Sequence, residues 1–267
     1  MKCTLLPAGV LLAMCLRAQP MTEPLSARPA QLSALAPSFR NALSFSANPA
    51  ALGGNGKLIL TAAGERRFVL SELGSYALAA RIPLAGNGVG IRIGQGTAPG
   101  WRAGSVAAAY GMQLGSLAAI GLGVAHSRFG APAARAGILE VQAGGLLRLQ
   151  PKLLLGLSAI EPVRRAADKA TAGGEARYAM AVGWEEPGQW MLGAELSQAG
   201  DRPPGFSAGF QLAVGRAVRA GAGIDTALSS MYLTVALPLA GMLLQPSVMV
   251  HRELGVAPGF LLSYPAQ

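Results

Sequence analysis

Large apolar residues alternate with small or polar residues along most of this chain, beginning near residue 57. Between residues 76 and 82, for example, Tyr76 and Leu78 fall on one face of an extended segment, while Arg81 falls on the other. A period of two is typical of β-strands that have one apolar face. The pattern predicts fourteen strands, near 57–64, 74–84, 88–95, 102–113, 116–128, 136–149, 152–160, 175–185, 189–198, 204–214, 216–225, 230–239, 241–250 and 257–265.

The connections between these segments alternate between two kinds. Seven long, charged connections follow the segments that end near Ala63, Gln95, Phe129, Glu161, Gln198, Asp225 and His251, and short turns lie between them. Outer-membrane barrels have long loops outside and short turns on the periplasmic side, and an even strand number places both chain ends at the periplasmic side. The pattern therefore predicts an all-β fold, a transmembrane antiparallel up-and-down barrel of about fourteen strands, in a bacterial outer membrane.

One proline conflicts with this regular pattern. Pro83 and Pro238 lie at strand ends beside turns, but Pro246 falls inside the thirteenth strand. Because proline has no N–H to donate to a ladder, we expect a bulge or a break at Pro246.

Composition separates this barrel from a soluble sheet protein and from a helical membrane protein. Charged residues make up only 13% of the chain and hydrophobic residues 51%, whereas a soluble domain carries about 25% charged residues. No apolar run in the body of the chain reaches the roughly 20 residues that a membrane helix needs. Interleaved apolar and small residues instead fit a wall in which only alternate positions face lipid.

The first residues are typical of a secretory signal peptide. Lys2 gives the positive start, residues 4–16 form the apolar core, and Ala18 offers a small residue for cleavage. A lipoprotein signal that uses Cys15 is the alternative, although Met14 occupies a position where a small residue is preferred. We predict three parts: a signal peptide over 1–18, a periplasmic leader or plug over 19–55 and the barrel over 56–267. Cleavage removes both cysteines, Cys3 and Cys15.

Net charge is +9, and many of the basic residues lie in the long connections, including Arg164, Arg165 and Lys169. On an outside loop they could contact outer-membrane lipid headgroups or lipopolysaccharide, or they could be ordinary solvated charges. They do not form a stripe with interleaved aromatic residues, so we expect no nucleic-acid partner.

Several polar side chains are predicted on the lumen face of the strands. We interpret them as an internal salt-bridge network that fills the barrel, because buried polar groups need partners, and keep a selectivity lining as the alternative. These lumen-facing residues are Arg81, Arg92, Glu140, Gln142, Glu195, Gln211, Arg219 and Asp225.

One sequence motif raises the possibility of catalysis. Residues 205–209 match the pattern GxSxG around Ser207, and Asp225 and His251 follow in the order of a hydrolase triad. A nucleophile elbow needs a strand followed by a helix, however, and here the motif starts a strand. We therefore expect no enzyme activity and keep an outer-membrane hydrolase as a third alternative. The two histidines lack carboxylates at ligand spacing, so we expect no metal and no cofactor.

Short motifs resemble one family of outer-membrane barrels. The sequence Asn48-Pro49-Ala50-Ala51-Leu52 resembles the NPAxL element near the mature N-terminus of barrels related to FadL, a group that includes the PorV and PorQ proteins of type IX secretion. Residues 67–74, 201–206 and 254–260 are similar to segments of Bacteroidetes members of that group. The resemblance implies either passage or binding of small hydrophobic molecules, or a secretion-linked scaffold that docks a partner protein on its loops.

The segment around this motif is the predicted gate. Asn48, Pro49 and Leu52 precede the first strand, and the Asn-Pro pair favours a turn that would fold the segment into the periplasmic mouth.

Overall fold

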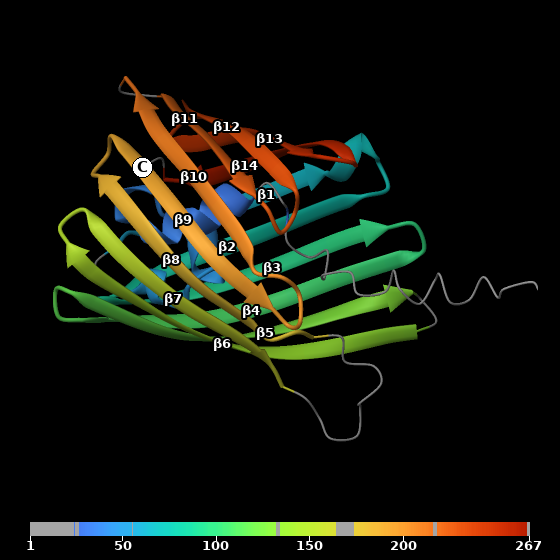
Figure 1. Cartoon of the computed structure of the whole chain (residues 1–267), viewed down its shortest axis with the longest axis horizontal. Coiled ribbons are helices and arrows are strands. Elements are labelled where there is room, and N and C mark those ends of the chain that lie inside the picture. The colour runs from blue at the N-terminus through green and yellow to red at the C-terminus, as the bar shows by residue number, and fades with distance from the viewer. Residues whose placement is uncertain are drawn as a thin grey trace, which may run out of the picture.

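Fourteen antiparallel strands close into one barrel within the described part of the chain, and β14 pairs back with β1 (Figure 1). The structure is a computed structural model that describes residues 24, 27–54, 56–131, 134–163, 174–215 and 218–265. The strands are β1 (Ile59–Arg66), β2 (Gly74–Leu84), β3 (Asn87–Ala98), β4 (Trp101–Leu114), β5 (Ala118–Ala131), β6 (Ala134–Gln150), β7 (Leu153–Pro162), β8 (Arg177–Glu186), β9 (Trp190–Ala199), β10 (Gly205–Val214), β11 (Val218–Asp225), β12 (Ser230–Leu239), β13 (Met242–His251) and β14 (Gly255–Tyr264). The predicted fold class is confirmed.

The two sides of the barrel differ in height. Strands β4 and β5 have 14 residues each and β6 has 17, whereas β7 to β10 have 10 each. The prediction of seven long connections is therefore wrong: Pro99 and Gly100 alone join β3 to β4, and two residues join β5 to β6. The ladders continue to these short turns, with Arg102 paired with Thr97 and Arg128 paired with Gly137.

The longest connection runs from β7 to β8, over residues 163–176. The predicted basic loop residues Arg164, Arg165 and Lys169 lie in it, outside the described residues. No helix in the described part of the chain has the length and apolar character needed to span a bilayer.

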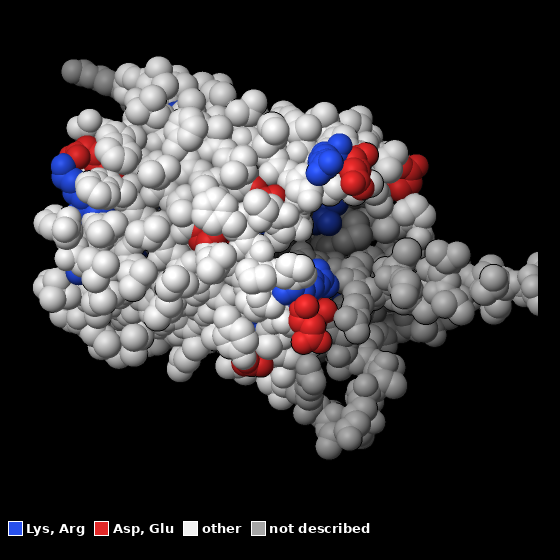
Figure 2. Space-filling model, in the orientation of Figure 1, with Lys and Arg blue, Asp and Glu red and all other residues white. Residues whose placement is uncertain are grey.

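The wall sorts its side chains as the alternation predicts. Leu78, Leu122 and Leu233 point outward and are 62–65% exposed, whereas inward neighbours such as Ala79 and Arg81 are buried. On the face shown in Figure 2, acidic and basic residues lie mainly near the two ends of the barrel, and few lie between them. An apolar band with charged ends is the surface that a lipid bilayer requires.

Pro246 neither bulges nor ends its strand. β13 runs without interruption from Met242 to His251, and its register with β12 is the same on both sides of the proline. The pairing lapses at Gln245 and Pro246, because proline cannot donate a hydrogen bond, and resumes at Ser247. The register shift that the structure does contain lies between β6 and β7, at Arg148 to Gln150.

Short helices occupy the interior of the barrel, drawn in blue in Figure 1. They are α2 (Arg28–Leu32), η2 (Ser33–Leu35), η3 (Pro37–Phe39), η4 (Ala42–Ser46) and η5 (Pro49–Leu52), and a further turn, η6 (Arg67–Val69), lies between β1 and β2. Residues 27–54 are called the plug below. Phe45 and Leu52 pack into an apolar cluster with Ile59 of β1 and Leu261 of β14. Gly54 donates a hydrogen bond to the Gly86 carbonyl in the β2–β3 turn, so the plug ends at the short-turn end of the barrel.

A closed ladder leaves no sheet edge from which unfolding could start, so the barrel should resist detergent at room temperature. We expect the folded protein to migrate differently on a denaturing gel with and without boiling, and to fractionate with the outer membrane. Recovery as a soluble cytoplasmic protein with a single gel mobility would contradict this prediction.

Candidate functional site: the plug and its seat in the barrel

Glycines on the inner wall allow the plug to lie against the backbone of the strands. A methyl group at Gly121 would lie 2.3 Å from the carbonyl carbon of Pro49, and one at Gly144 would lie 2.1 Å from Asn48 Oδ1. A Cβ atom does not approach a non-bonded atom this closely, so a larger residue at either position would force the plug to move. The glycine seat, as we call it, comprises Gly88, Gly90, Gly111, Gly121, Gly144 and Gly183, each within 2.6 Å of a plug atom by the same measure.

Asn48 connects the plug to two strands at once. Its Nδ2 donates to the carbonyl oxygens of Gly145 on β6 (3.1 Å) and Leu157 on β7 (3.0 Å). Its Oδ1 accepts from the backbone N–H of Ala50 at 3.0 Å and so starts η5, in which Pro49 takes the first position. Asparagine supplies both the donors and the acceptor on one short side chain. The three predicted gate residues, Asn48, Pro49 and Leu52, are all buried between the plug and the wall.

Arginines hold the plug by its backbone carbonyl groups. Arg81 of β2 donates through Nη2 to the Leu52 carbonyl (3.3 Å) and the Gly54 carbonyl (3.5 Å). Arg40, within the plug, donates to the carbonyls of Ala34 and Ala51. Burial lowers the pKa of the Arg40 guanidinium to about 10, so it stays protonated at neutral pH.

Two further predicted lumen arginines also contact the plug. Arg92 Nη1 donates to the Ser46 hydroxyl at 3.2 Å, and the Arg219 guanidinium carbon lies 4.9 Å from the centre of the Phe39 ring. Of the plug partners, Arg40 and Phe39 were not singled out in the sequence, because nothing in their local pattern shows what lies across the barrel.

The predicted lumen carboxylates lie nearer the opposite end. Asp225 is 3.7 Å from Arg28 at the start of the plug, and Glu140 is 3.4 Å from Arg177 of β8. Glu195 is half-buried and is the cross-strand partner of Ser207.

The two predicted lumen glutamines complete the set. Gln142 is buried, and Gln211 lines a small cavity between the plug and the wall with Arg40 and Gln245. The sequence did not indicate Glu185, which is 4% exposed and accepts a hydrogen bond from the Ser38 N–H at 2.9 Å. The polar side chains inside the barrel therefore bind the plug to the wall, in addition to linking neighbouring strands.

The residues of the hydrolase motif do not form a triad. Ser207 and Asp225 are cross-strand partners, but His251 pairs with Ser230 and lies two strands, about 10 Å, from Asp225. His251 Nδ1 accepts hydrogen bonds from the backbone N–H groups of Glu253 and Leu254, which leaves one ring nitrogen where a triad needs two, one for the carboxylate and one for the serine. GxSxG here lies within β10, with no following helix, which removes the geometric basis of the hydrolase alternative.

Together, the closed wall and its interior plug define a plugged barrel of the outer-membrane type. No protein-family model matches the sequence, and no curated protein matches it.

Several solved structures share the barrel fold. The chain is similar to the CymD monoaromatic hydrocarbon channel (TM-score 0.59, 11% identity, covering 84% of this chain and 91% of that one). It is also similar to the Ralstonia pickettii toluene transporter TbuX (TM-score 0.58, 10% identity, covering 84% of this chain and 92% of that one). A third similar structure is a Pseudomonas aeruginosa FadL homologue (TM-score 0.55, 10% identity, covering 86% of this chain and 94% of that one). At these identities the likeness concerns the fold. It agrees with the FadL part of the resemblance, whereas the PorV and PorQ part and a Bacteroidetes origin stay predictions.

Proposed function

We propose that this protein resides in a bacterial outer membrane and binds small hydrophobic molecules or lets them pass, with the plug as the gate. The observation that carries the proposal is the fit of the plug into the glycine seat at the short-turn end of the barrel. Every contact described there is non-covalent, and the barrel ladder does not depend on the plug for its strand pairing.

The lining of the wall is compatible with an apolar cargo. On β4 and β5 the inward positions between the plug and the end of the barrel that carries the long connections are small. Ala103, Ala107 and Ala125 are buried there on the inner face. The predicted lumen charges lie on other strands, and all of them except Glu195 contact the plug or another charged side chain, as described above. A hydrophobic molecule would therefore meet small side chains along this side, namely the methyl groups of these alanines and the hydroxyl groups of Ser105 and Ser127. Hydrocarbon channels and a toluene transporter among the similar structures support a cargo of this class.

Dye uptake by intact Gram-negative cells tests the proposal. We expect cells that express the protein to take up an apolar dye, N-phenylnaphthylamine, faster than cells that carry an empty vector, while entry of a hydrophilic β-lactam such as nitrocefin stays unchanged. Equal dye uptake in the two strains, with correctly assembled barrel in the membrane, would contradict transport.

The secretion-linked scaffold makes the opposite prediction. It requires a partner protein on the outside loops, with Arg164 and Arg165 as the predicted contacts. Charge removal at these two arginines would then weaken capture of the partner and leave dye uptake unchanged. The contacts between plug and wall favour the channel, because a scaffold that works through its loops has no need of a fitted interior segment.

A further inference from the structure

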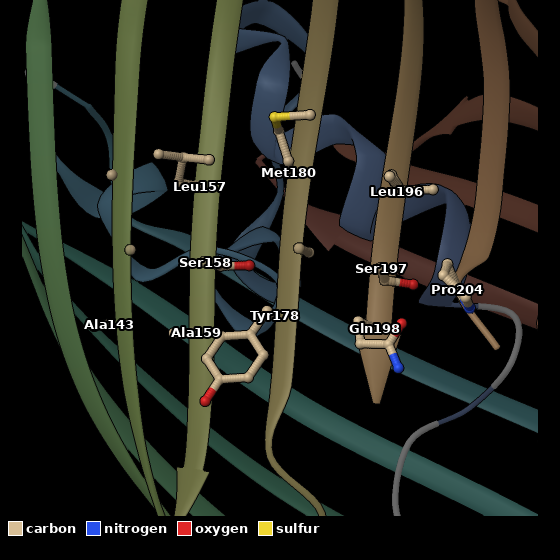
Figure 3. A pocket seen from close by; sticks show the side chains of 13 residues that line it. Ala143, Leu157, Ser158, Ala159, Tyr178, Met180, Leu196, Ser197, Gln198 and Pro204 are labelled. Atoms are coloured by element: carbon tan, nitrogen blue, oxygen red, sulfur yellow. The ribbon is translucent and has the colours of Figure 1, made fainter. Parts of the chain in front are cut away.

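A groove crosses the outer face of strands β6 to β9 (Figure 3). Strand register arranges its outward residues in two adjacent rows. One row is Gly145, Leu157, Met180 and Leu196, and the other is Ala143, Ala159, Tyr178 and Gln198. The groove has a volume of about 650 Å³, which is within the range of small-molecule sites.

Small residues produce the depth of this groove. Gly145 begins the first row, and a methyl group added there would meet nothing within 4 Å. Ala143 and Ala159 leave similar room in the second row. Around them Leu157, Met180 and Leu196 stand out from the wall with about half of their surface exposed. The result is a concave apolar surface on the outer wall.

The groove faces the membrane side only. The ladders from β7 to β8 and from β8 to β9 are continuous through both rows, and the β6–β7 register shift lies beyond them at Arg148. A ligand in the groove must therefore come from the surrounding bilayer and not from the lumen.

One end of the groove is polar. The Tyr178 hydroxyl donates to the Glu161 carboxylate on the outer face, and the Gln198 side chain bonds to the backbone of the β9–β10 connection. These groups lie on the side of the long connections, while the row of Leu157, Met180 and Leu196 lies deeper in the apolar band. The groove is therefore apolar deep in the membrane and polar near the membrane boundary. An amphiphile with an apolar tail and a polar head would fit it in that orientation.

We propose that this groove is a binding site for one acyl chain of a membrane lipid, with the lipid headgroup beside Tyr178 and Glu161. The proposal rests on the membrane location proposed above but not on transport. A second copy of the barrel is a poorer fit, since stable interfaces bury about 1,000 Å² or more between complementary surfaces, whereas a narrow concavity accepts a single chain. The exposed Glu161 carboxylate also favours a headgroup that can donate hydrogen bonds through amine or hydroxyl groups.

Purified full-length protein in vesicles of phosphatidylethanolamine and phosphatidylglycerol tests the site. A phosphatidylethanolamine with a photoreactive group on its acyl chain is crosslinked, and labelled peptides are mapped by mass spectrometry. We expect labelling to concentrate on the segments around Leu157 and Met180. Gly145→Leu, which fills the open space, should lower the affinity for the probe roughly tenfold or more, the usual cost of a misfit in an apolar pocket.

Ala108→Leu is the matched control, because Ala108 is an exposed, outward residue on β4. It should leave labelling around Leu157 unchanged. Ala159→Leu, in the second row, replaces Gly145→Leu if that variant fails to show the gel shift of a folded barrel.

Two results would overturn the proposal. One is even labelling of all outward strands in the native protein, unaffected by the groove variants. The other is efficient disulfide crosslinking of an Ala159→Cys variant with itself, which would assign the groove to a second copy. A transport assay that fails would leave the labelling result intact, so the two proposals fail separately.

Discussion

Deletion of Pro37–Leu52 should raise uptake of the apolar dye by about tenfold to a thousandfold, because a plug-free state that is normally a minor population of ~0.1–10% becomes the only state. The deleted residues include those that fill five of the six positions of the glycine seat, and Leu52, whose carbonyl Arg81 holds. Strand pairing does not involve them, so the barrel should persist. Fluorescence of N-phenylnaphthylamine in intact cells measures the effect.

Two controls make this deletion interpretable. The unboiled protein must retain its shifted gel mobility, since loss of the plug exposes apolar residues such as Ile59 and Leu261. The amount of barrel in the outer membrane must equal that of the native protein. Unchanged uptake by a correctly assembled deletion variant would refute the gate and favour the scaffold.

Asn48→Ala should raise dye uptake less than the deletion does, but still strongly. The change removes two hydrogen bonds to the wall and one within η5. The two wall carbonyls left unsatisfied cost about 1–3 kcal/mol each, so docking should weaken by ~2–6 kcal/mol. At about 1.4 kcal/mol per factor of ten, the equilibrium constant for release of the plug rises roughly thirtyfold or more, and dye uptake rises toward the level of the deletion variant. Dye uptake and hydrogen exchange of the plug amides report the change.

Asn48→Asp separates docking from local turn formation. Aspartate keeps the oxygen that accepts from Ala50, but it cannot donate to the Gly145 and Leu157 carbonyls and places negative charge beside them. We expect an effect at least as large as that of alanine. Behaviour like the native protein would show that Asn48 serves the turn alone.

The wall offers a matched pair for the same test. Gly144→Ala places a methyl group 2.1 Å from Asn48 Oδ1 and should displace the plug, whereas Gly145→Ala places it in open space and should be silent. The two residues are neighbours in β6, and a methyl group added to each would point to opposite faces of the wall. Equal effects from both would argue against a specific seat.

Sequence by itself determined the barrel, its strand number and the face of each residue. The predicted segments 74–84 and 230–239 coincide with β2 and β12. A period of two can be recognised from neighbouring residues alone, without information on long-range contacts. The low charge content predicted in the same way that the outer face of the wall meets lipid, since each outward position contributes independently of the others.

Only the tertiary structure decided what the inward residues contact. Asn48 and Leu157 are 109 positions apart, and Ser38 and Glu185 are 147 apart. Closure of the ladder brings them together, and no local pattern encodes that approach. The same holds for Gly144 and Gly145, which are identical in sequence terms. One is required by the plug behind it, and the other leaves a groove toward the lipid, because adjacent residues of a strand point to opposite sides of the wall.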